Sequence, residues 1–174
     1  MRNLSVHEGI PGHYLQSVVW QRGKRSPVRF LGISDEIAGS RAYFGTMMSV
    51  EGWAVHMEHL LREEGFFDDG PEAIFEAFVA SIHAVRILND LEVHCAGMSD
   101  DAATTQFANA TLMPERWARM QVLRSRRIPL QHLTYLLGSY EIERLRARAF
   151  AAGTSKRAFY GALLEHGPVP PSGL

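Results

Sequence analysis

Proline and glycine divide the sequence into segments with helical periodicity, and this punctuation restricts the fold more than any other feature. Pro71 and Pro114 stand at the start of two such segments, where the first turn of a helix tolerates a proline. Gly65 and Gly153 follow two others, at the position where glycine commonly ends a helix. No segment alternates apolar and polar residues as a half-buried strand does. The sequence therefore predicts an all-α fold, a helical bundle of about six or seven helices.

The predicted helices cover most of the 174 residues. They comprise residues 4–20, residues 42–64, residues 71–95, a helix capped by Ser99, one that begins at Pro114, residues 130–152 after Pro129, and one capped by Thr154 that ends at Gly167. Residues 23–39 are predicted to connect the first two helices. We expect a single helical domain over residues 1–174. Because the richest motif begins at the seventh residue, we also expect this domain to be the C-terminal part of a longer protein.

Composition argues against several classes of protein. The net charge is -1, so bulk electrostatics gives no reason to expect nucleic-acid binding. Cys95 is the single cysteine, which rules out an internal disulfide and a cysteine-based zinc site. No apolar run approaches the ~20 residues that cross a bilayer, and no signal peptide precedes His7. The chain as given is therefore expected to be cytoplasmic, while a longer parent with its own signal peptide is an open alternative.

The segment from His7 to His13 reads HEGIPGH and is typical of a zinc (Zn2+) site. Neutral imidazoles bind zinc, and an adjoining glutamate, here Glu8, handles the bound water. The usual spacing is H-E-x-x-H, whereas six positions on an ideal helix separate two side chains by about 240°. Pro11 disrupts the preceding turn and Gly12 tolerates unusual backbone angles, so a break can bring the two imidazoles together. By spacing alone, two ordinary histidines are an equal alternative.

Glu51 is the candidate third ligand. It stands beside Val50, Trp53 and Ala54 in an apolar helical segment, and a buried carboxylate there needs a cation. Glu58 follows seven residues later on roughly the same helix face, where it can orient a ligand histidine. The alternative is that both glutamates lie on a solvated face, as most helical glutamates do.

Two further groups of residues can carry chemistry. Arg86, Asp90 and His94 are spaced by four and share one helix face, either as an exposed ion-pair ladder or as a buried functional group. Tyr135 is either a core residue or, in a zinc hydrolase, a donor to a developing oxyanion.

Together these residues resemble the bacterial "domain of unknown function 885" family, which is similar to gluzincin metallopeptidases. The resemblance covers nearly the whole chain and rests on several motifs in the same order. They are H-E-x-x-P-G-H-x-x-Q at His7 to Gln16, E-G-W-A-x-x-x-E at Glu51 to Glu58, R-x-x-x-D-x-x-x-H at Arg86 to His94, Q-x-x-x-Y-x-x-G at Gln131 to Gly138, and Leu145-Arg146. The closing Gly167-Pro168-Val169-Pro170 is also similar.

The resemblance implies a zinc-dependent hydrolase, most simply a metallopeptidase, with a gluzincin-like catalytic half. His7, His13 and Glu51 would bind zinc and Glu8 would act as general base. The remaining implied site residues are Tyr135 and His94 for the transition state, Arg86, Arg146 and Gln131 for a peptide or small amide substrate, and Glu58 and Asp90 behind the ligands.

The chain also departs from the family pattern, and alternatives stay open. The family usually has Tyr at His56 and Gly at Leu130, and its members are several times longer, with an N-terminal helical half that this chain lacks. One alternative is a hydrolase of esters or non-peptide amides, because the same water chemistry serves both. Another is a helical module without activity that needs its missing half.

Overall fold

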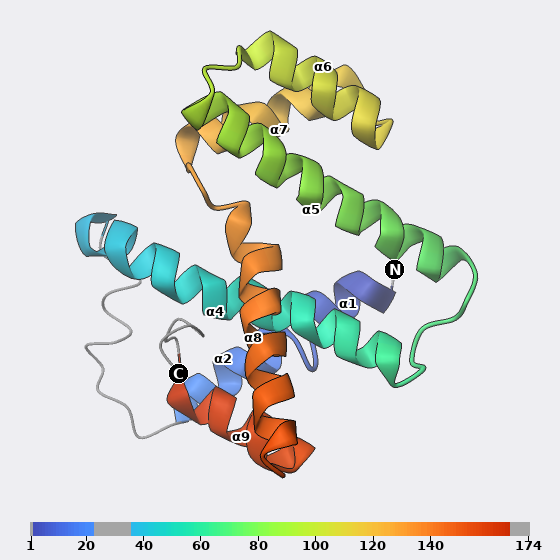
Figure 1. Ribbon diagram of the computed structural model, residues 1–174, viewed down its shortest axis with the longest axis vertical. Coiled ribbons are helices and arrows are strands. Elements are labelled where there is room, and N and C mark those ends of the chain that lie inside the picture. The colour runs from blue at the N-terminus through green and yellow to red at the C-terminus, as the bar shows by residue number, and fades with distance from the viewer. Residues whose placement is uncertain (1, 23–35, 168–174) are drawn as a thin grey trace. The chain divides into compact units, whose positions relative to one another are not determined.

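The computed structural model describes residues 2–22 and 36–167, with the side chains of residues 21 and 36–46 left aside. Within these ranges the chain is all-α, with eight helices and no strand (Figure 1). They are α1 (Arg2–Glu8), α2 (His13–Arg22), α4 (Glu36–Glu63), α5 (Pro71–Cys95), α6 (Asp100–Thr111), α7 (Glu115–Arg127), α8 (Leu133–Ala151) and α9 (Lys156–His166). None of these helices is both long and apolar enough to cross a membrane.

The chain divides into two compact units. Unit 1 comprises Met1–Phe67 and Leu137–Leu174, and unit 2 comprises Asp68–Leu136. Unit 1 therefore holds α1, α2, α4, α9 and nearly all of α8, while unit 2 holds α5, α6 and α7. That residues 1–174 fold as one domain stays a prediction.

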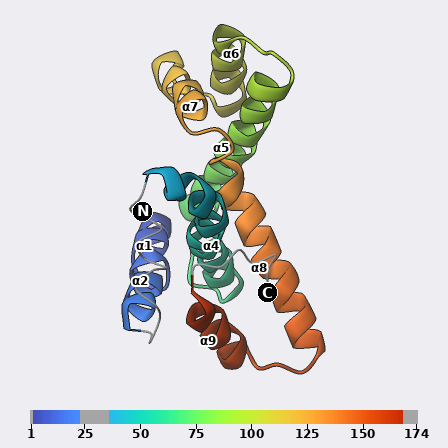
Figure 2. The same cartoon turned by 90° about the vertical axis from the view of Figure 1, so that its left-hand side faces the viewer.

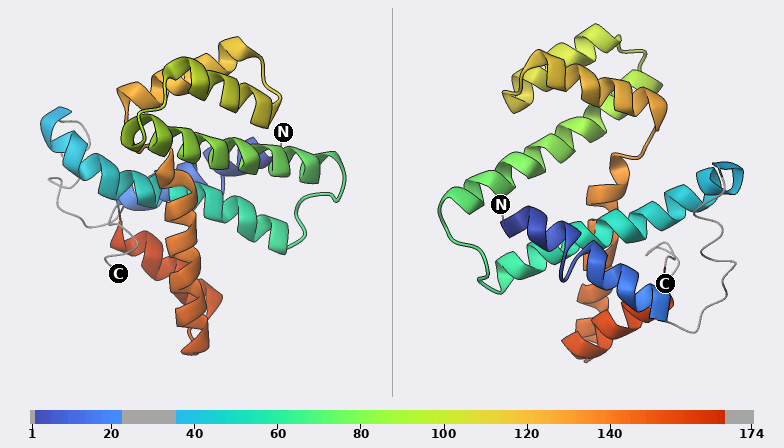
Figure 3. Two further views of the ribbon diagram at one scale, coloured as in Figure 1. Left: turned by 45° about the horizontal axis from the view of Figure 1, so that its top comes forward. Right: turned by 180° about the vertical axis from the view of Figure 1, so that it is seen from behind.

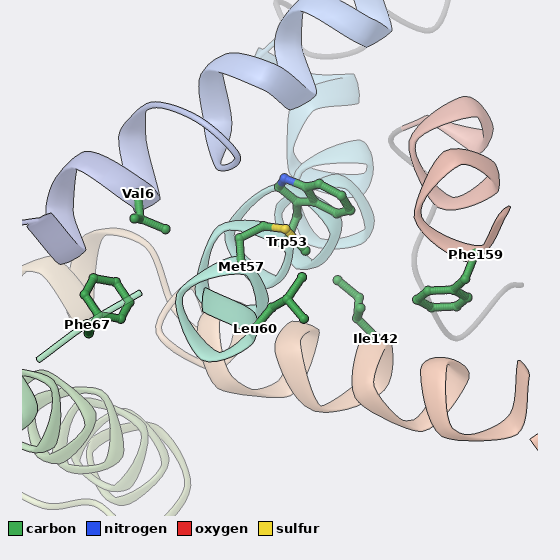
Figure 4. Packing of buried hydrophobic residues seen from close by; sticks show 7 residues of the cluster. All are labelled: Val6, Trp53, Met57, Leu60, Phe67, Ile142 and Phe159. Atoms are coloured by element: carbon green, nitrogen blue, oxygen red, sulfur yellow. The ribbon is translucent and has the colours of Figure 1, made fainter. Parts of the chain in front are cut away.

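Unit 1 is built around α4. Helices α1 and α2 both pack along α4, and α2 also contacts α9 (Figure 2). Apolar side chains from α1, α4, α8, α9 and the turn after α4 meet in one core (Figure 4). The core consists of Val6, Trp53, Met57, Leu60, Phe67, Ile142 and Phe159. This core fixes the position of α4, the helix that also carries the candidate ligand Glu51 on another face.

Helices α4 and α8 approach each other closely at two glycines. A Cβ atom added to Gly52 would lie 2.4 Å from the carbonyl carbon of Gly138, and one added to Gly138 would lie 2.2 Å from the carbonyl oxygen of Met48. Both distances are far below contact range, so only glycine fits at either position. The Gly52–Gly138 contact therefore holds the backbone of α4 against α8 directly beside Glu51.

Unit 2 is a three-helix arrangement of α5, α6 and α7, which pack against one another in pairs (Figure 3). Its core has two layers, and each layer takes one buried residue from each helix. The layers are Ile82, Phe107 and Ala118, and Val93, Ala103 and Val122. Ser99 caps α6 as predicted, because its hydroxyl accepts a hydrogen bond from the N–H of Ala102 at 3.2 Å.

Two predictions near the N-terminus differ from the structure. The predicted helix over residues 4–20 is two helices, α1 and α2, separated at residues 9–12. The second helix begins at Glu36 rather than at Ala42, because Glu36, Ile37 and Ala38 favour a helix and one internal glycine costs only about 1 kcal/mol. Most of the predicted connection, residues 23–35, lies outside the described residues.

Two helix starts in the second half of the chain also differ. Helix α8 begins at Leu133 rather than at residue 130, because Leu130 has a left-handed backbone with φ of 66° and its N–H donates to Asp90. The cap of α9 is Ser155 rather than Thr154, since the Ser155 hydroxyl accepts from the N–H of Ala158 at 3.2 Å. The glycine stops at Gly65, Gly153 and Gly167 all have positive φ, as predicted for helix ends.

Candidate metal centre

The candidate centre begins at the break between α1 and α2. The N–H of Gly12 reaches back to the carbonyl of Val6 at 3.0 Å, and the N–H of Tyr14 donates to the carbonyl of Gly9 at 3.1 Å. Gly12 lies so close to α1 that an added Cβ would be 1.9 Å from the carbonyl oxygen of His7. The glycine of the motif is therefore required by space, in addition to any freedom of its backbone angles.

This break brings the two histidines of the motif together. The ring centroids of His7 and His13 are 4.7 Å apart with their planes at 85°. On one straight helix the same residues would point about 240° apart. The sequence predicted a distorted helix here, and the structure has a complete interruption in which His7 is near the end of α1 and His13 opens α2.

Glu51 from α4 completes the group. Its Oε2 lies 3.6 Å from Nε2 of His7 and 3.5 Å from Nε2 of His13. Donor atoms of the three side chains all lie within 4.8 Å of one another. Two donors that are each about 2 Å from a tetrahedral zinc ion lie roughly 3.3 Å apart, and the two distances to Glu51 are close to this value. The group holds two imidazoles and one carboxylate, the donor set of many zinc hydrolases.

Glu58 holds the far side of the His7 ring. Its Oε1 lies 2.5 Å from Nδ1 of His7, and its Oε2 accepts a hydrogen bond from the side-chain amide of Asn3 at 2.7 Å. A carboxylate on Nδ1 places a proton there and turns Nε2 towards Glu51, where it could act as a metal ligand once its own proton is displaced. Glu58 and Asn3 are both buried, which keeps this orientation fixed.

The electrostatics of the group match a site for a cation. Burial alone would lower the pKa of His7, but hydrogen bonds and negative charge from Glu51 and Glu58 raise it to about 9. Burial alone would raise the pKa of Glu51, but hydrogen bonds and positive charge from His13 and His7 lower it to about 2. Two carboxylates therefore surround His7, and the pocket favours positive charge.

Two remaining features concern the edge of the group. Nδ1 of His13 is buried and has no hydrogen-bond partner among the described residues. Glu8, the predicted general base, is the last residue of α1 and its side chain is exposed. Glu8 is thus open to solvent and adjoins the candidate ligand His7 in the sequence.

Comparison with known proteins assigns the family. A family model described as "Bacterial protein of unknown function (DUF885)" matches residues 1–174. The chain belongs to this family. A comparison with curated proteins gives no match.

Two solved structures share the fold of this DUF885 chain. A "putative lipoprotein" from Colwellia psychrerythraea superimposes with a TM-score of 0.77 and 26% sequence identity, over 98% of this chain and 28% of that one. A "putative lipoprotein of unknown function" from Shewanella oneidensis gives a TM-score of 0.81 and 26% sequence identity, over 98% of this chain and 30% of that one. The chain thus spans less than a third of the length of either protein.

Two supports of the centre in this DUF885 chain were missed by sequence reasoning. The indole N–H of Trp53 donates to the carbonyl of Pro11 at 2.9 Å, and the side-chain amide of Gln16 donates to the carbonyl of Ser49 at 2.8 Å. The first bond fixes the loop between α1 and α2 on α4, and the second fixes α2 on α4. Only the amphipathic indole of Trp53 gave a signal, because a buried Trp needs a partner for its N–H.

Arg146 of α8, a predicted substrate residue, lies in unit 1 within a paired network. Its guanidinium bonds both carboxylate oxygens of Glu63, at 3.2 and 2.9 Å, and lies 3.3 Å from Glu143. The nearby ring of His56 is buried, and its Nε2 shares a hydrogen bond of 2.9 Å with the hydroxyl of Tyr160. Burial, and after it the charge of Arg146, lower the pKa of His56 to about 3. Two carboxylates already neutralise Arg146, so its predicted role in holding a substrate carboxylate has little support from its contacts.

The other predicted site residues of the DUF885 chain lie in unit 2. Asp90 is fully buried; its Oδ2 accepts from the N–H of Leu130 at 2.9 Å and its Oδ1 lies 3.3 Å from Nε2 of His94. Burial raises the pKa of Asp90, while the Leu130 hydrogen bond and His94 oppose that shift. Asp90 therefore acts in unit 2 as the acceptor that shapes the turn before α8.

Unit 2 also contains predicted and unpredicted polar residues in one cluster. Arg86 donates from Nε to Gln121 at 3.0 Å, and the ring of Tyr135 stacks on His83 with centroids 4.8 Å apart. The cluster includes Arg124, His83 and His132, which sequence reasoning missed; Gln131 and Ser125 are their partners. Spacing gave no signal for these three, because they come from α5, α7 and the turn before α8.

Proposed function

We propose that the chain binds one zinc ion on His7, His13 and Glu51 and belongs to a zinc-dependent hydrolase of the gluzincin kind. The observation that carries this proposal is the convergence of three donors from α1, α2 and α4, with donor distances of 3.5 and 3.6 Å to the shared carboxylate oxygen. The acidic surroundings of His7 support it, because they favour a cation. The family itself is described only as of unknown function, so the activity rests on this chemistry.

The residues around the ion have separate tasks in this proposal. Zinc in such a site is a Lewis acid that lowers the pKa of water to ~7. Glu8, exposed beside His7, takes a proton from the attacking water and returns it to the leaving amine. Glu58 and Asn3 hold the His7 ring so that Nε2 faces the ion. Trp53 and Gln16 hold the loop and α2 in place.

Residues outside unit 1 enter the proposal through the family resemblance. Tyr135 and His94 are proposed to stabilise the transition state, Gln131 and Arg86 to contact the substrate, and Asp90 to support them. A peptide is the proposed substrate, and an ester or non-peptide amide is the second candidate. Since each of the two similar structures is described as a "putative lipoprotein", we propose an exported parent protein rather than a cytoplasmic one.

Zinc stoichiometry tests the ligand set. The purified chain should hold about one zinc per molecule by metal analysis after dialysis. His13→Ala should lose it, because a site with two protein ligands binds zinc weakly. His166→Ala is a matched control, since His166 is exposed on α9. Full zinc content in His13→Ala would remove that residue from the ligand set.

Hydrolysis is tested separately from metal binding. Glu8→Gln should keep the zinc and lose turnover of a panel of short peptides, because the amide cannot accept the proton. The same panel should include esters, whose preferential cleavage would favour the second candidate. Unaltered turnover in Glu8→Gln would exclude Glu8 as the base, and zinc binding without any turnover would favour an inactive helical module.

A further inference from the structure

Unit 2 holds two arginines whose charge is not matched by a carboxylate. Arg86 on α5 donates from Nε to the amide oxygen of Gln121 at 3.0 Å, and Arg124 on α7 donates from Nε to the amide oxygen of Gln131 at 3.0 Å. Neither guanidinium forms an ion pair with a carboxylate among the described residues. We call Arg86 and Arg124 the arginine pair.

The two members of the arginine pair lie near each other. Gln121, the partner of Arg86, is three residues before Arg124 on α7, so both side chains leave the same face of that helix. Burial and the positive charge of Arg124 lower the pKa of Arg86, while Tyr135 opposes that shift. Both arginines are partly buried, and Arg86 bonds a residue one helical turn from Arg124.

The ring of His132, beside the arginine pair, carries no charge that would balance the two arginines. His132 is 1% exposed, with Nδ1 at 3.1 Å from the Ser125 hydroxyl and Nε2 buried without a hydrogen-bond partner among the described residues. Burial, the arginine pair and His83 lower the pKa of His132 to about 3, so its ring is neutral at pH 7. Oδ2 of Asp90 lies 4.0 Å from Nδ1 of His132, and the same oxygen accepts the N–H of Leu130.

The glutamine bonds use only the Nε–H of each arginine, and the Arg86 guanidinium also lies over the Trp117 ring, 5.8 Å from its centroid. Each Nε–H is used by an amide oxygen, so each fork of terminal N–H donors still lacks a charged acceptor. Both side chains are half-buried, which leaves them reachable from solvent yet poorly screened by it. Like charges in such a setting repel, and a bound anion would both remove that repulsion and accept the free donors.

We propose that unit 2 binds one small oxyanion group, a carboxylate or a phosphate, between Arg86 and Arg124. Both ions present planar or tetrahedral oxygens that match the guanidinium fork. Arg146 is not part of this anion site, because it lies in unit 1 and already pairs with Glu63 and Glu143. This proposal rests on the substrate role given above to Arg86 and deepens it by naming the group that Arg86 would hold; because anion binding can be measured without zinc, its failure and the failure of the zinc site can be told apart.

The test is a titration of the full chain observed by NMR at the side-chain Nε–H groups of Arg86 and Arg124. Sodium phosphate and N-acetylglycine are added in separate series, with ionic strength held constant by sodium chloride. We expect saturable shifts of both signals, and the ion that saturates at lower concentration identifies the natural group as phosphate or carboxylate. Signals that do not shift, or shift without saturation, with either ion would overturn the proposal without any mutant.

Variants then assign the site to the arginine pair. Arg86→Gln and Arg124→Gln should each weaken the binding of the better ion by about tenfold or more, the usual effect of losing a charged hydrogen-bond donor. Arg116→Gln removes the same charge from an exposed position on α7 and should leave the affinity unchanged. Equal weakening in all three variants would mean a general charge effect and would refute the site.

Discussion

Units 1 and 2 both bury histidine among charged side chains, but the charges have opposite signs. In unit 1, Glu51 and Glu58 flank His7 and raise its pKa to about 9. In unit 2, the arginine pair lies near His132, whose pKa falls to about 3. Burial lowers the pKa in both places, so burial does not make the difference. The neighbours decide whether an imidazole favours or avoids positive charge.

A third histidine shows that this rule follows neighbours rather than units. His56 is buried in unit 1, yet burial, Arg146 and His59 lower its pKa to about 3. Of the three histidines compared, His7, which two carboxylates face, is the one whose charged form its neighbours favour. The comparison therefore predicts a cation site in unit 1 and an anion site in unit 2, and each can be tested without the other.

Removal of the shared carboxylate should have the largest effect. Glu51→Gln loses the ligand that contacts both His7 and His13, and we expect zinc affinity to fall by about 10³-fold, as for the loss of one ligand of a three-ligand site. Competition with a zinc chelator measures the affinity. Glu165→Gln, an exposed change on α9, is the matched control. Unchanged affinity in Glu51→Gln would break the assignment of unit 1 as the cation site.

The next effect concerns the helix crossing that supports this site. Gly52→Ala places a Cβ 2.4 Å from the backbone of Gly138, so α4 and α8 must separate and the free energy of unfolding should drop by about 3 kcal/mol. Urea unfolding measures this value.

Gly161→Ala is the control for the crossing. Gly161 lies within α9 with nothing within 4 Å of an added Cβ, so this change should stabilise the chain by up to about 1 kcal/mol through helix propensity. If both alanines changed stability in the same direction, the close approach of α4 and α8 would not be required for folding.

Most of the helices were predictable because local chemistry decides them. Pro71, Ser99 and Gly65 act within one turn, so their effect can be read from a few residues. The start of α8 was not predictable, since Leu130 takes its left-handed conformation with its N–H on Asp90, forty residues earlier in the chain. Contacts over such distances leave no trace in local periodicity.

The same limit applies to the candidate sites. The break at Pro11 and Gly12 was predicted because the proline disrupts its own turn, and the proximity of the histidines follows from it. The arginine pair was not predicted as a pair, because Arg86 reaches Gln121 only after α5 and α7 pack. The division of the chain into two units was likewise absent from the sequence pattern.

A smaller effect is expected from the residue behind the ligand. Glu58→Gln keeps an acceptor for His7 but loses the charge that favours its metal-binding form, so zinc affinity should fall by about 10- to 100-fold. Chelator competition again gives the value. Glu64→Gln is the control, because Glu64 pairs only with Lys156 at the surface. An effect as large as that of Glu51→Gln would instead make Glu58 a direct ligand.

The smallest effect, taken one pH unit at a time, is the change of zinc affinity with pH. Because the pKa of His7 is raised to about 9, above its ordinary value of 6.5, the metal-free site holds a proton that zinc must displace. Protonation of His7 contributes stability to the metal-free fold. This contribution is complete below pH 6.5, the ordinary pKa, and disappears as the pH rises through about 9, the pKa in the folded chain. Zinc affinity should therefore fall by about tenfold for each pH unit below 9, while Glu51, with a pKa of about 2, stays ionised.

NMR of the histidine rings and zinc titrations at several pH values measure this coupling. The His7 signals should shift with a midpoint near pH 9, whereas those of His132 should stay constant between pH 9 and pH 5 because its pKa is about 3. Glu58→Gln should move the His7 midpoint down and shorten the range over which zinc affinity depends on pH. Constant zinc affinity between pH 6 and pH 9 would mean that zinc displaces no proton from His7 in this range. The carboxylates of unit 1 would then not raise the pKa of His7, and the contrast with unit 2 would be lost.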